Sequence, residues 1–201
     1  MRFLGPPWCA GCNRPFEYDR GPDARCGGCL ADPPRHAGVR AAVAYDETSR
    51  RLALRLKYGR RIGLAATMAR YMARLVPDDV DLIVPVPLHR WRLWTRGFNQ
   101  SVAMGDALTA LTGRPMDRLA LVRTRATASL KGRGHKARAK AVRGAFAVID
   151  RERVAGRRIA LVDDVYTSGA TADAATRALL RAGAASVTVL CWARVLDDAV
   201  D

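Results

Sequence analysis

Residues 159–171 read Ile-Ala-Leu-Val-Asp-Asp-Val-Tyr-Thr-Ser-Gly-Ala-Thr, and this stretch decides the fold class. Four apolar residues lead to the adjacent carboxylates Asp163 and Asp164, a short loop follows, and a helical pattern covers residues 171–182. A buried strand that enters a helix through such a loop is where α/β proteins bind phosphate, because backbone N–H groups and the helix dipole favour an anion there. Ionised carboxylates suit sugar hydroxyls and hydrated Mg²⁺. The stretch therefore predicts a sugar-phosphate site, and an ordinary strand before an acid-capped helix is the alternative.

Outward from this stretch, strands and helices alternate along the chain. We expect strands at 39–45, 81–86, 119–123, 145–149, 158–162 and 186–193, and helices at 47–57, 63–76, 97–112 and 171–182. Because the strands are short and apolar throughout, they are typical of a parallel sheet covered by helices on both faces. We therefore predict an α/β fold for residues 37–201.

Four of the five cysteines form two Cys-x-x-Cys pairs near the N-terminus. The pairs are Cys9 with Cys12 and Cys26 with Cys29, and thirteen residues separate them. This spacing is close to that of zinc ribbons, in which four thiolates bind Zn²⁺ tetrahedrally. Two disulfides are the alternative, and they would need an oxidising compartment. Residues 1–36 have too few apolar residues to form a core alone, so we predict a small ribbon that a structural Zn²⁺ holds together.

The chain is strongly basic, with 34 Lys and Arg against 19 Asp and Glu and a net charge of +15. This surplus favours anionic partners, either nucleic acid or phosphorylated small molecules, although a preference for Arg codons would also produce it. No run of eighteen apolar residues is present, so we expect no insertion into a membrane. The N-terminus does not read as a basic segment leading into an apolar one, and we therefore expect a cytoplasmic protein.

Two further segments offer cations for the same site. The first, residues 84–100, contains Arg90, Arg92 and Arg96 just after an apolar strand, where they could bind a diphosphate. The second, residues 123–143, holds eight Lys or Arg and no acid, and its glycines and like charges predict mobility. A mobile basic loop could close over a bound diphosphate, and a contact strip for nucleic acid or a solvated helix face are the alternatives.

The 159–171 stretch resembles the 5-phosphoribosyl-1-pyrophosphate (PRPP) motif of type I phosphoribosyltransferases. The four-cysteine ribbon, Val-Pro-Val-Pro-Leu at 84–88, Arg-Gly-Phe-Asn-Gln at 96–100 and this motif occur in the same order in the ComF family. Val-Arg-Gly-Ala-Phe at 142–146 is similar to the segment that follows the flexible loop in that family. The resemblance covers residues 9–193 and implies a type I phosphoribosyltransferase-like sheet with an N-terminal zinc ribbon.

The resemblance also implies roles for individual residues. Asp163 and Asp164 would hold the ribose hydroxyls and, with PRPP, Mg²⁺. The 5′-phosphate would lie in a loop made of Thr167, Ser168, Gly169, Ala170 and Thr171. A diphosphate loop would comprise Leu88, His89, Arg90, Trp91 and Arg92. The flexible basic loop would contribute Arg123, Arg125, Lys131, Arg133, Lys136 and Arg138.

Some positions depart from the family pattern. Members often carry Gln and Leu where this chain reads Leu-Lys-Gly-Arg at 130–133, and Arg-x-x-Asn where it reads Arg-Ala-Lys-Ala at 138–141. Purine-salvage relatives place an acid at the position of Thr167, and a threonine cannot exchange a proton with a base in that way. The sequence offers no nucleophile for hydrolysing glutamine, because Cys9, Cys12, Cys26 and Cys29 are better explained as metal ligands.

Two functions follow from the sequence. One is a ComF-like protein that binds PRPP and Mg²⁺, with phosphoribosyl transfer and diphosphate release as its reaction, linked to competence and DNA uptake. The other is an accessory protein that keeps the fold but binds single-stranded nucleic acid without turnover, as arginine-rich grooves do. The acceptor substrate, the catalytic base and the oligomeric state are not encoded in any motif that we recognise.

Overall fold

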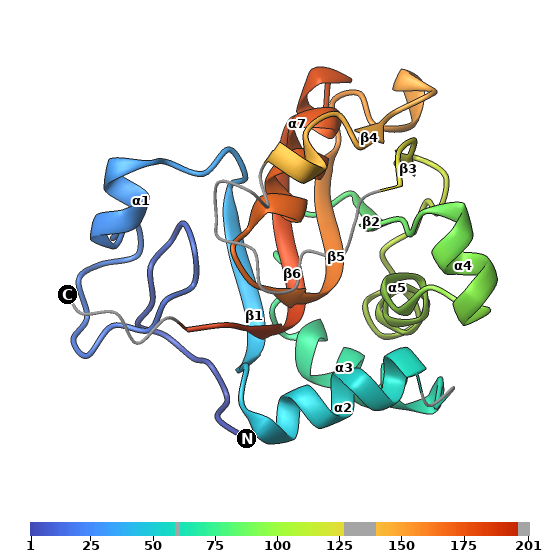
Figure 1. The fold of residues 1–201 in the computed structure, drawn as a ribbon. Helices are drawn as coiled ribbons and strands as arrows, with labels where there is room; N and C mark the ends of the chain where they lie inside the picture. Colours follow the sequence, from blue (N-terminus) through green and yellow to red (C-terminus); the bar gives the residue numbers. More distant parts are fainter. Residues whose placement is uncertain (59–60, 127–139, 197–201) are drawn as a thin grey trace.

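A computed structural model describes residues 1–58, 61–126 and 140–196 (Figure 1). Its main sheet contains four parallel strands in the order β1-β6-β5-β2. These strands are β1 (Gly38–Ala44), β2 (Leu82–Pro85), β5 (Arg158–Tyr166) and β6 (Ser186–Arg194). The larger helices are α2 (Glu47–Tyr58), α3 (Gly63–Ala73), α5 (Gln100–Thr112) and α7 (Ala170–Arg181). The predicted α/β fold with a parallel sheet is confirmed.

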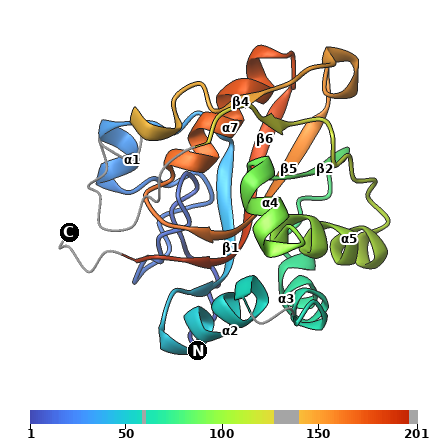
Figure 2. The ribbon, with the colours of Figure 1, turned by 45° about the vertical axis from the view of Figure 1, so that its right-hand side comes forward.

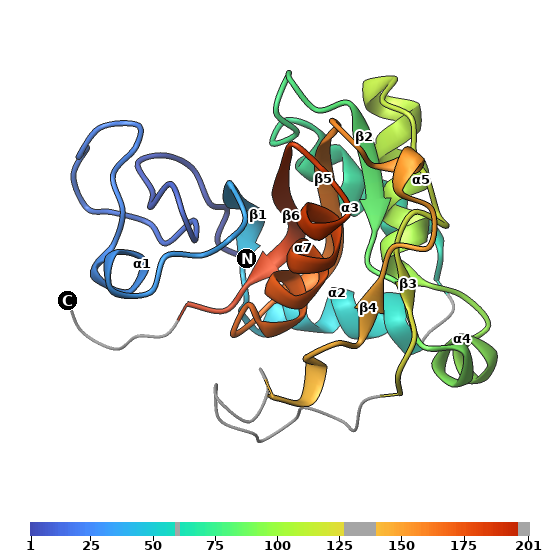
Figure 3. The same cartoon turned by 90° about the horizontal axis from the view of Figure 1, so that it is seen from above.

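Helices cover both faces of the sheet, as the uniformly apolar strands require. Ile159 and Leu161 of β5 pack in a core cluster that includes Leu179 of α7. Ala160 and Val162, which point to the opposite face, pack in a second cluster with residues of α2, α3 and α5. Figure 3 shows α7 on one side of the sheet and α3 and α5 on the other.

Backbone segments cover both edges of the sheet. At the β1 edge, the N–H of Leu4 donates to the carbonyl of Ala42 and the N–H of Ala44 donates to the carbonyl of Arg2. At the β2 edge, the N–H of Ile83 donates to the carbonyl of Pro115. Such covering prevents the backbone N–H and C=O groups of the edge strands from pairing with a strand of another chain.

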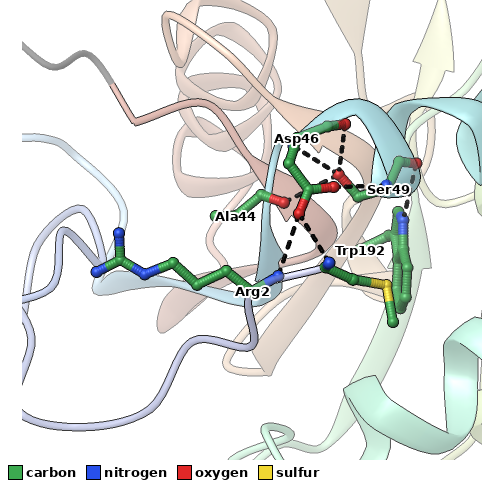
Figure 4. A network of polar contacts seen from close by, with 6 residues as sticks. Arg2, Ala44, Asp46, Ser49 and Trp192 are labelled. Atoms are coloured by element: carbon green, nitrogen blue, oxygen red, sulfur yellow. Dashed lines mark hydrogen bonds and ion pairs between the residues drawn. The ribbon is translucent and has the colours of Figure 1, made fainter.

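Helix α2 begins with a capping box (Figure 4). The N–H of Ser49 donates to Asp46 Oδ1, and the N–H of Asp46 donates to Ser49 Oγ, both at 2.8 Å. The hydrogen bond from the Ser49 N–H, together with further hydrogen bonds, lowers the pKa of Asp46 to about 2. The indole of Trp192 in β6 donates to the carbonyl of Ser49. These contacts fix α2 against the sheet and thereby set the position of Lys57 near its far end.

Three details differ from the sequence-based expectations. Residues 90–96, expected as part of a loop, form helix α4 (Arg90–Arg96) (Figure 2). His89 caps its N-terminus, and Gly97 caps its C-terminus in a left-handed conformation. Strand β5 continues to Tyr166 instead of ending at residue 162, because β6 pairs with it that far. The expected strands at 119–123 and 145–149 are the short antiparallel pair β3 (Val122–Arg123) and β4 (Phe146–Ala147), outside the parallel sheet.

The N-terminal segment lies beside β1 (Figure 1). It contains the short helix α1 (Gly27–Ala31). Elsewhere in the chain, a 3-10 helix, η1 (Arg151–Arg153), precedes β5. Further contacts, in addition to those of residues 2 and 4, attach the segment to β1: the N–H of Val39 donates to the carbonyl of Gly11, and the N–H of Ala41 donates to Asn13 Oδ1 at 2.7 Å. A boundary between two domains after residue 36 stays a prediction. Among the described residues, no helix is long and apolar enough to cross a membrane.

Candidate sugar-phosphate site and cysteine cluster

Asp163 and Asp164, here called the carboxylate pair, lie near the carboxyl end of β5, where side chains of α2 and α5 reach them from one face of the sheet. The hydroxyl of Ser101, in the first turn of α5, lies 3.5 Å from Asp163 Oδ1. Lys57 Nζ, in the last turn of α2, lies 3.4 Å from Asp164 Oδ2. The carboxyl ends of parallel strands are where ligands bind in open α/β sheets. The sequence pattern places Lys57 in a basic helix without singling it out, and it gives no signal for Ser101.

The carboxylate pair is electrostatically unusual. Burial, followed by the negative charge of Asp164, raises the pKa of Asp163 to about 7. The N–H of Asp164 and the positive charges of Lys57 and Arg123 act in the opposite direction and do not offset it. Two carboxylates close together ionise fully only with a cation or hydrogen-bond donors nearby. The pair therefore suits a ligand that brings hydroxyl donors, and it could hold Mg²⁺.

Two arginines predicted for different loops meet near the carboxylate pair. Burial, and then the positive charge of Arg92, lowers the pKa of Arg123, whereas the charge of Asp163 opposes this. The three charged groups are thus close enough to interact, and the guanidinium of Arg123 also lies 5.2 Å from the ring centroid of Phe146. Arg92 and Arg123 could face the diphosphate of a ligand whose sugar lies on the carboxylate pair.

The other residues of the predicted diphosphate loop are arranged differently. Leu88 and His89 precede α4, whereas Arg90 and Trp91 line a cavity of about 380 Å³ together with Trp94. Trp91 and Trp94 are largely exposed, and their rings contact edge to face. Of the predicted flexible loop, Arg123 and Arg125 are described, and Lys131, Arg133, Lys136 and Arg138 lie outside the described residues.

Of the predicted phosphate loop, Thr167, Ser168 and Gly169 join β5 to α7, and Ala170 and Thr171 are the first two residues of α7. Gly169 precedes α7 with φ +74°, a conformation that favours glycine. A Cβ at this position would lie 2.5 Å from the hydroxyl of Tyr166, so the tyrosine occupies the space that any larger residue would need. The loop thus leads into the N-terminus of a twelve-residue helix, where backbone N–H groups suit an anion.

Cys9, Cys12, Cys26 and Cys29, here called the cysteine cluster, come together as predicted. Their four Sγ atoms lie within 4.8 Å of one another, and Cys12 Sγ lies 3.6 Å from Cys26 Sγ. A tetrahedral zinc site with Zn–S bonds of about 2.3 Å has S···S distances of about 3.8 Å, so the residues fit a structural Zn²⁺. All four are free thiols, and the N–H groups of Cys12 and Cys26 point at Cys9 Sγ. The fifth cysteine, Cys191, is buried in β6.

The cysteine cluster and the phosphate loop border the same cavity, which has a volume of about 720 Å³. Cys12 and Cys29 line one part of it and Ser168, Gly169 and Ala170 line another. His36, between them, is buried, and burial lowers its pKa to about 4. The imidazole is therefore neutral at physiological pH.

A second cavity of about 700 Å³ runs along α7 and is strongly basic. Five of its lining residues are cationic and none is acidic: Arg35, Lys140, Arg143, Arg177 and Arg181. Arg177 is paired with Asp173 at 2.6 Å. Within the described ranges the other four make no ion pair with a carboxylate. The sequence pattern places the basic strip at residues 123–143 but does not associate it with α7.

Comparison with known proteins finds relatives over nearly the whole chain, although no protein-family model matches it. The chain is 34% identical over 196 residues to DNA utilization protein YhgH of Escherichia coli, covering 94% of this chain and 84% of that protein. It is 28% identical over 197 residues to Competence protein F of Haemophilus influenzae, with similar coverage. Competence protein ComFC of Bacillus subtilis is 32% identical over 117 residues, which are 58% of this chain and 45% of that protein.

Solved structures resemble the chain more distantly. A glutamine PRPP amidotransferase from B. subtilis complexed with ADP and GMP has a TM-score of 0.44 and 23% identity. The match covers 62% of this chain but only 25% of that protein. The protein TT1426 from Thermus thermophilus has a TM-score of 0.38 and 16% identity, covering 72% of this chain and 86% of that one.

Proposed function

The chain belongs to the ComF family, whose members include the DNA utilization and competence proteins above, and we propose that it binds PRPP together with Mg²⁺. The observation that carries the proposal is the carboxylate pair near the carboxyl end of β5, two residues before the loop that leads into the N-terminus of α7. Sugar hydroxyls would donate to the carboxylates, and a 5′-phosphate would accept from the N–H groups of the loop.

The cations around the carboxylate pair support the same ligand. Asp163 and Asp164 would hold Mg²⁺ together with ribose hydroxyls, and the ion would supply positive charge next to the diphosphate. Arg92 and Arg123, which interact with each other and lie near Asp163, would bind the diphosphate oxygens. Lys57 would orient Asp164 through its 3.4 Å contact.

Phosphoribosyl transfer is the reaction that such a site would perform. The bond between C1 of the ribose and the diphosphate oxygen would break, the electron pair would leave with diphosphate, and an acceptor would attack C1. Arg92 and Arg123 would stabilise the charge that develops on the leaving diphosphate. The proposal rests on ligand binding more than on turnover, because Thr167 cannot act as the acid or base that purine-salvage relatives have at this position.

Calorimetric titration with PRPP and Mg²⁺ tests the proposal. We expect binding by the wild-type protein and at least a hundredfold loss of affinity in D163N and D164N. D106N is the matched control, since Asp106 lies on the exposed face of α5 and pairs with Arg118. Equal affinity of D163N and wild type would refute the site. Release of diphosphate with a panel of nucleobases and amines then decides whether the bound PRPP turns over.

The basic cavity along α7 favours a second function, the binding of single-stranded nucleic acid. Four cations there have no carboxylate partner in the described part of the chain, and the relatives' names refer to DNA and competence. The affinity for a single strand falls with salt at a slope of about −0.7 per phosphate contacted. Four contacts would therefore give a slope of about −3 in log K against log salt.

Fluorescence anisotropy with a labelled oligonucleotide measures this slope. R181Q should weaken binding and reduce the slope by about 0.7, because one phosphate contact is lost. R70Q, a matched charge loss on α3 across the sheet, should leave the slope unchanged. D163N should also leave it unchanged if PRPP and the strand occupy different sites. Weak binding that does not depend on salt would exclude this second function.

A further inference from the structure

Arg194, the last residue of β6, is buried beside the cysteine cluster. It is 7% exposed, and its Nη2 lies 3.4 Å from Cys12 Sγ. Its Nε and Nη1 are also buried and have no hydrogen-bond partner in the part of the chain that the structure describes. No carboxylate there pairs with it. A buried cation without a counter-charge is strongly destabilising, so Arg194 needs an anion nearby.

The cysteine cluster can supply that anion when it holds metal. Four thiolates and one Zn²⁺ carry a net charge of −2, because four negative charges and two positive ones are summed. Arg194 provides one positive charge, and Arg40 of β1 provides another, since its positive charge interacts with Cys9. The two arginines would therefore neutralise the metal-loaded cluster.

Arg194 also contacts the residue that supports the phosphate loop. Its guanidinium lies 5.9 Å from the ring centroid of Tyr166, within the range of a cation–π interaction. The two residues are direct neighbours in the pairing of β5 with β6. The hydroxyl of Tyr166 fills the space beside Gly169 and lies 3.4 Å from His36 Nε2. A continuous series of contacts thus leads from Cys12 through Arg194 and Tyr166 to Gly169.

We propose that Arg194 is a positioning residue through which the metal-loaded cysteine cluster holds the phosphate loop in its binding conformation. The thiolates fix the guanidinium, the guanidinium fixes the ring of Tyr166, and the tyrosine supports Gly169 at positive φ. Without metal, the four sulfur atoms are no longer held in place beside the guanidinium, and this support is released. The inference deepens the proposed function and rests on it, since it assigns control of the phosphate site to zinc occupancy.

Hydrogen exchange of the full-length protein, with zinc bound and after chelation, tests the proposal without requiring a ligand. Backbone amides of residues 167–173 should exchange at least tenfold faster after chelation, while amides of α3 across the sheet keep their protection. Zinc-loaded R194M should show the fast exchange of the zinc-free wild type. Zinc-loaded R40M is the matched control, because Arg40 stacks on Trp8 and hydrogen-bonds the backbone at residues 10 and 39, and it should retain slow exchange in the loop.

Two further measurements keep the result unambiguous. Zinc affinity should fall about 10- to 100-fold in both arginine variants, as is typical when a residue behind a metal ligand is replaced. Y166F keeps the ring but removes the hydroxyl, so it should bind zinc normally and still exchange faster in the loop. Slow loop exchange in zinc-loaded R194M would overturn the proposal. So would equal exchange rates of the loop in the wild type with and without zinc. Binding of ribose 5-phosphate to the wild type, measured separately, reports whether the proposed function itself fails.

Discussion

The carboxylate pair and the cysteine cluster both bring like-charged groups together, but the chain surrounds them differently. Lys57 and Arg123 approach the carboxylates, and the pKa of Asp163 nevertheless stays raised to about 7. Arg40 and Arg194 come from strands of the sheet and would balance a zinc-loaded cluster completely. The charge of the carboxylate pair is therefore only partly balanced by the chain, whereas the charge of a zinc-loaded cysteine cluster would be balanced by two arginines. Tyr166, two residues after Asp164 in β5, contacts Gly169 of the phosphate loop and Arg194 beside the cysteine cluster.

Removing one thiol of the cysteine cluster should have the largest effect, because the N-terminal segment would lose the metal that holds it together. C29S should lose zinc and release residues 1–36, since structural zinc contributes about 10–16 kcal/mol of apparent binding free energy to such segments. Metal analysis and limited proteolysis measure both effects. C191A is the control, because Cys191 is buried in β6 and is not one of the four clustered cysteines, and it should keep its zinc. Full zinc content in C29S would contradict a four-cysteine site.

A methyl group at Gly169 should disturb the phosphate loop. G169A combines an unfavourable positive φ with a clash against the hydroxyl of Tyr166, so we expect a loss of about 3 kcal/mol in the free energy of unfolding. G113A is the matched control: its φ is +69° and nothing lies within 4 Å of the added Cβ, so it isolates the backbone cost. Denaturant unfolding of both variants measures the difference. Equal losses would show that Tyr166 does not support Gly169.

Replacing Asp163 should change how the free energy of unfolding depends on pH. Because folding raises its pKa from 3.8 to about 7, the folded protein binds more protons than the unfolded chain in this interval. Stability without ligand should therefore fall as pH rises from about 4 to 7. D163N should remove this fall, and at pH 8 it should be more stable than wild type by on the order of 2 kcal/mol, allowing for partial exposure. Unfolding curves at pH 5 and 8 test the expectation, and parallel pH profiles of the two proteins would contradict it.

Lys57 should show the smallest effect. Its ion pair with Asp164 is partly exposed, so K57M should change the free energy of unfolding by no more than about 1 kcal/mol. Affinity for PRPP should fall by severalfold, because Asp164 loses its orienting partner. R51M on the same helix, which removes an exposed pair with Glu47, is the control. An unchanged affinity in K57M would place Lys57 outside the site.

Local sequence patterns predict the parallel sheet and the gathering of the four cysteines, because both depend on short-range spacing. They do not predict the contact of Lys57, since 107 positions separate it from Asp164 and only the packing of α2 brings them together. The surroundings of Arg194 are equally hidden, because a single arginine at the end of an apolar strand gives no signal of the thiols beside it. The sequence favours a loop where helix α4 forms, since its seven residues carry no buried face.

Titration with PRPP and Mg²⁺ at pH 6 and pH 8 tests the central claim, that the carboxylate pair is a binding site awaiting a ligand. With the pKa of Asp163 near 7, only about a tenth of the protein carries the ionised form at pH 6, so affinity should be about tenfold weaker there than at pH 8. D163N should bind weakly at both pH values. Binding that is equally strong in D163N, or no heat at either pH in the wild type, would contradict the account.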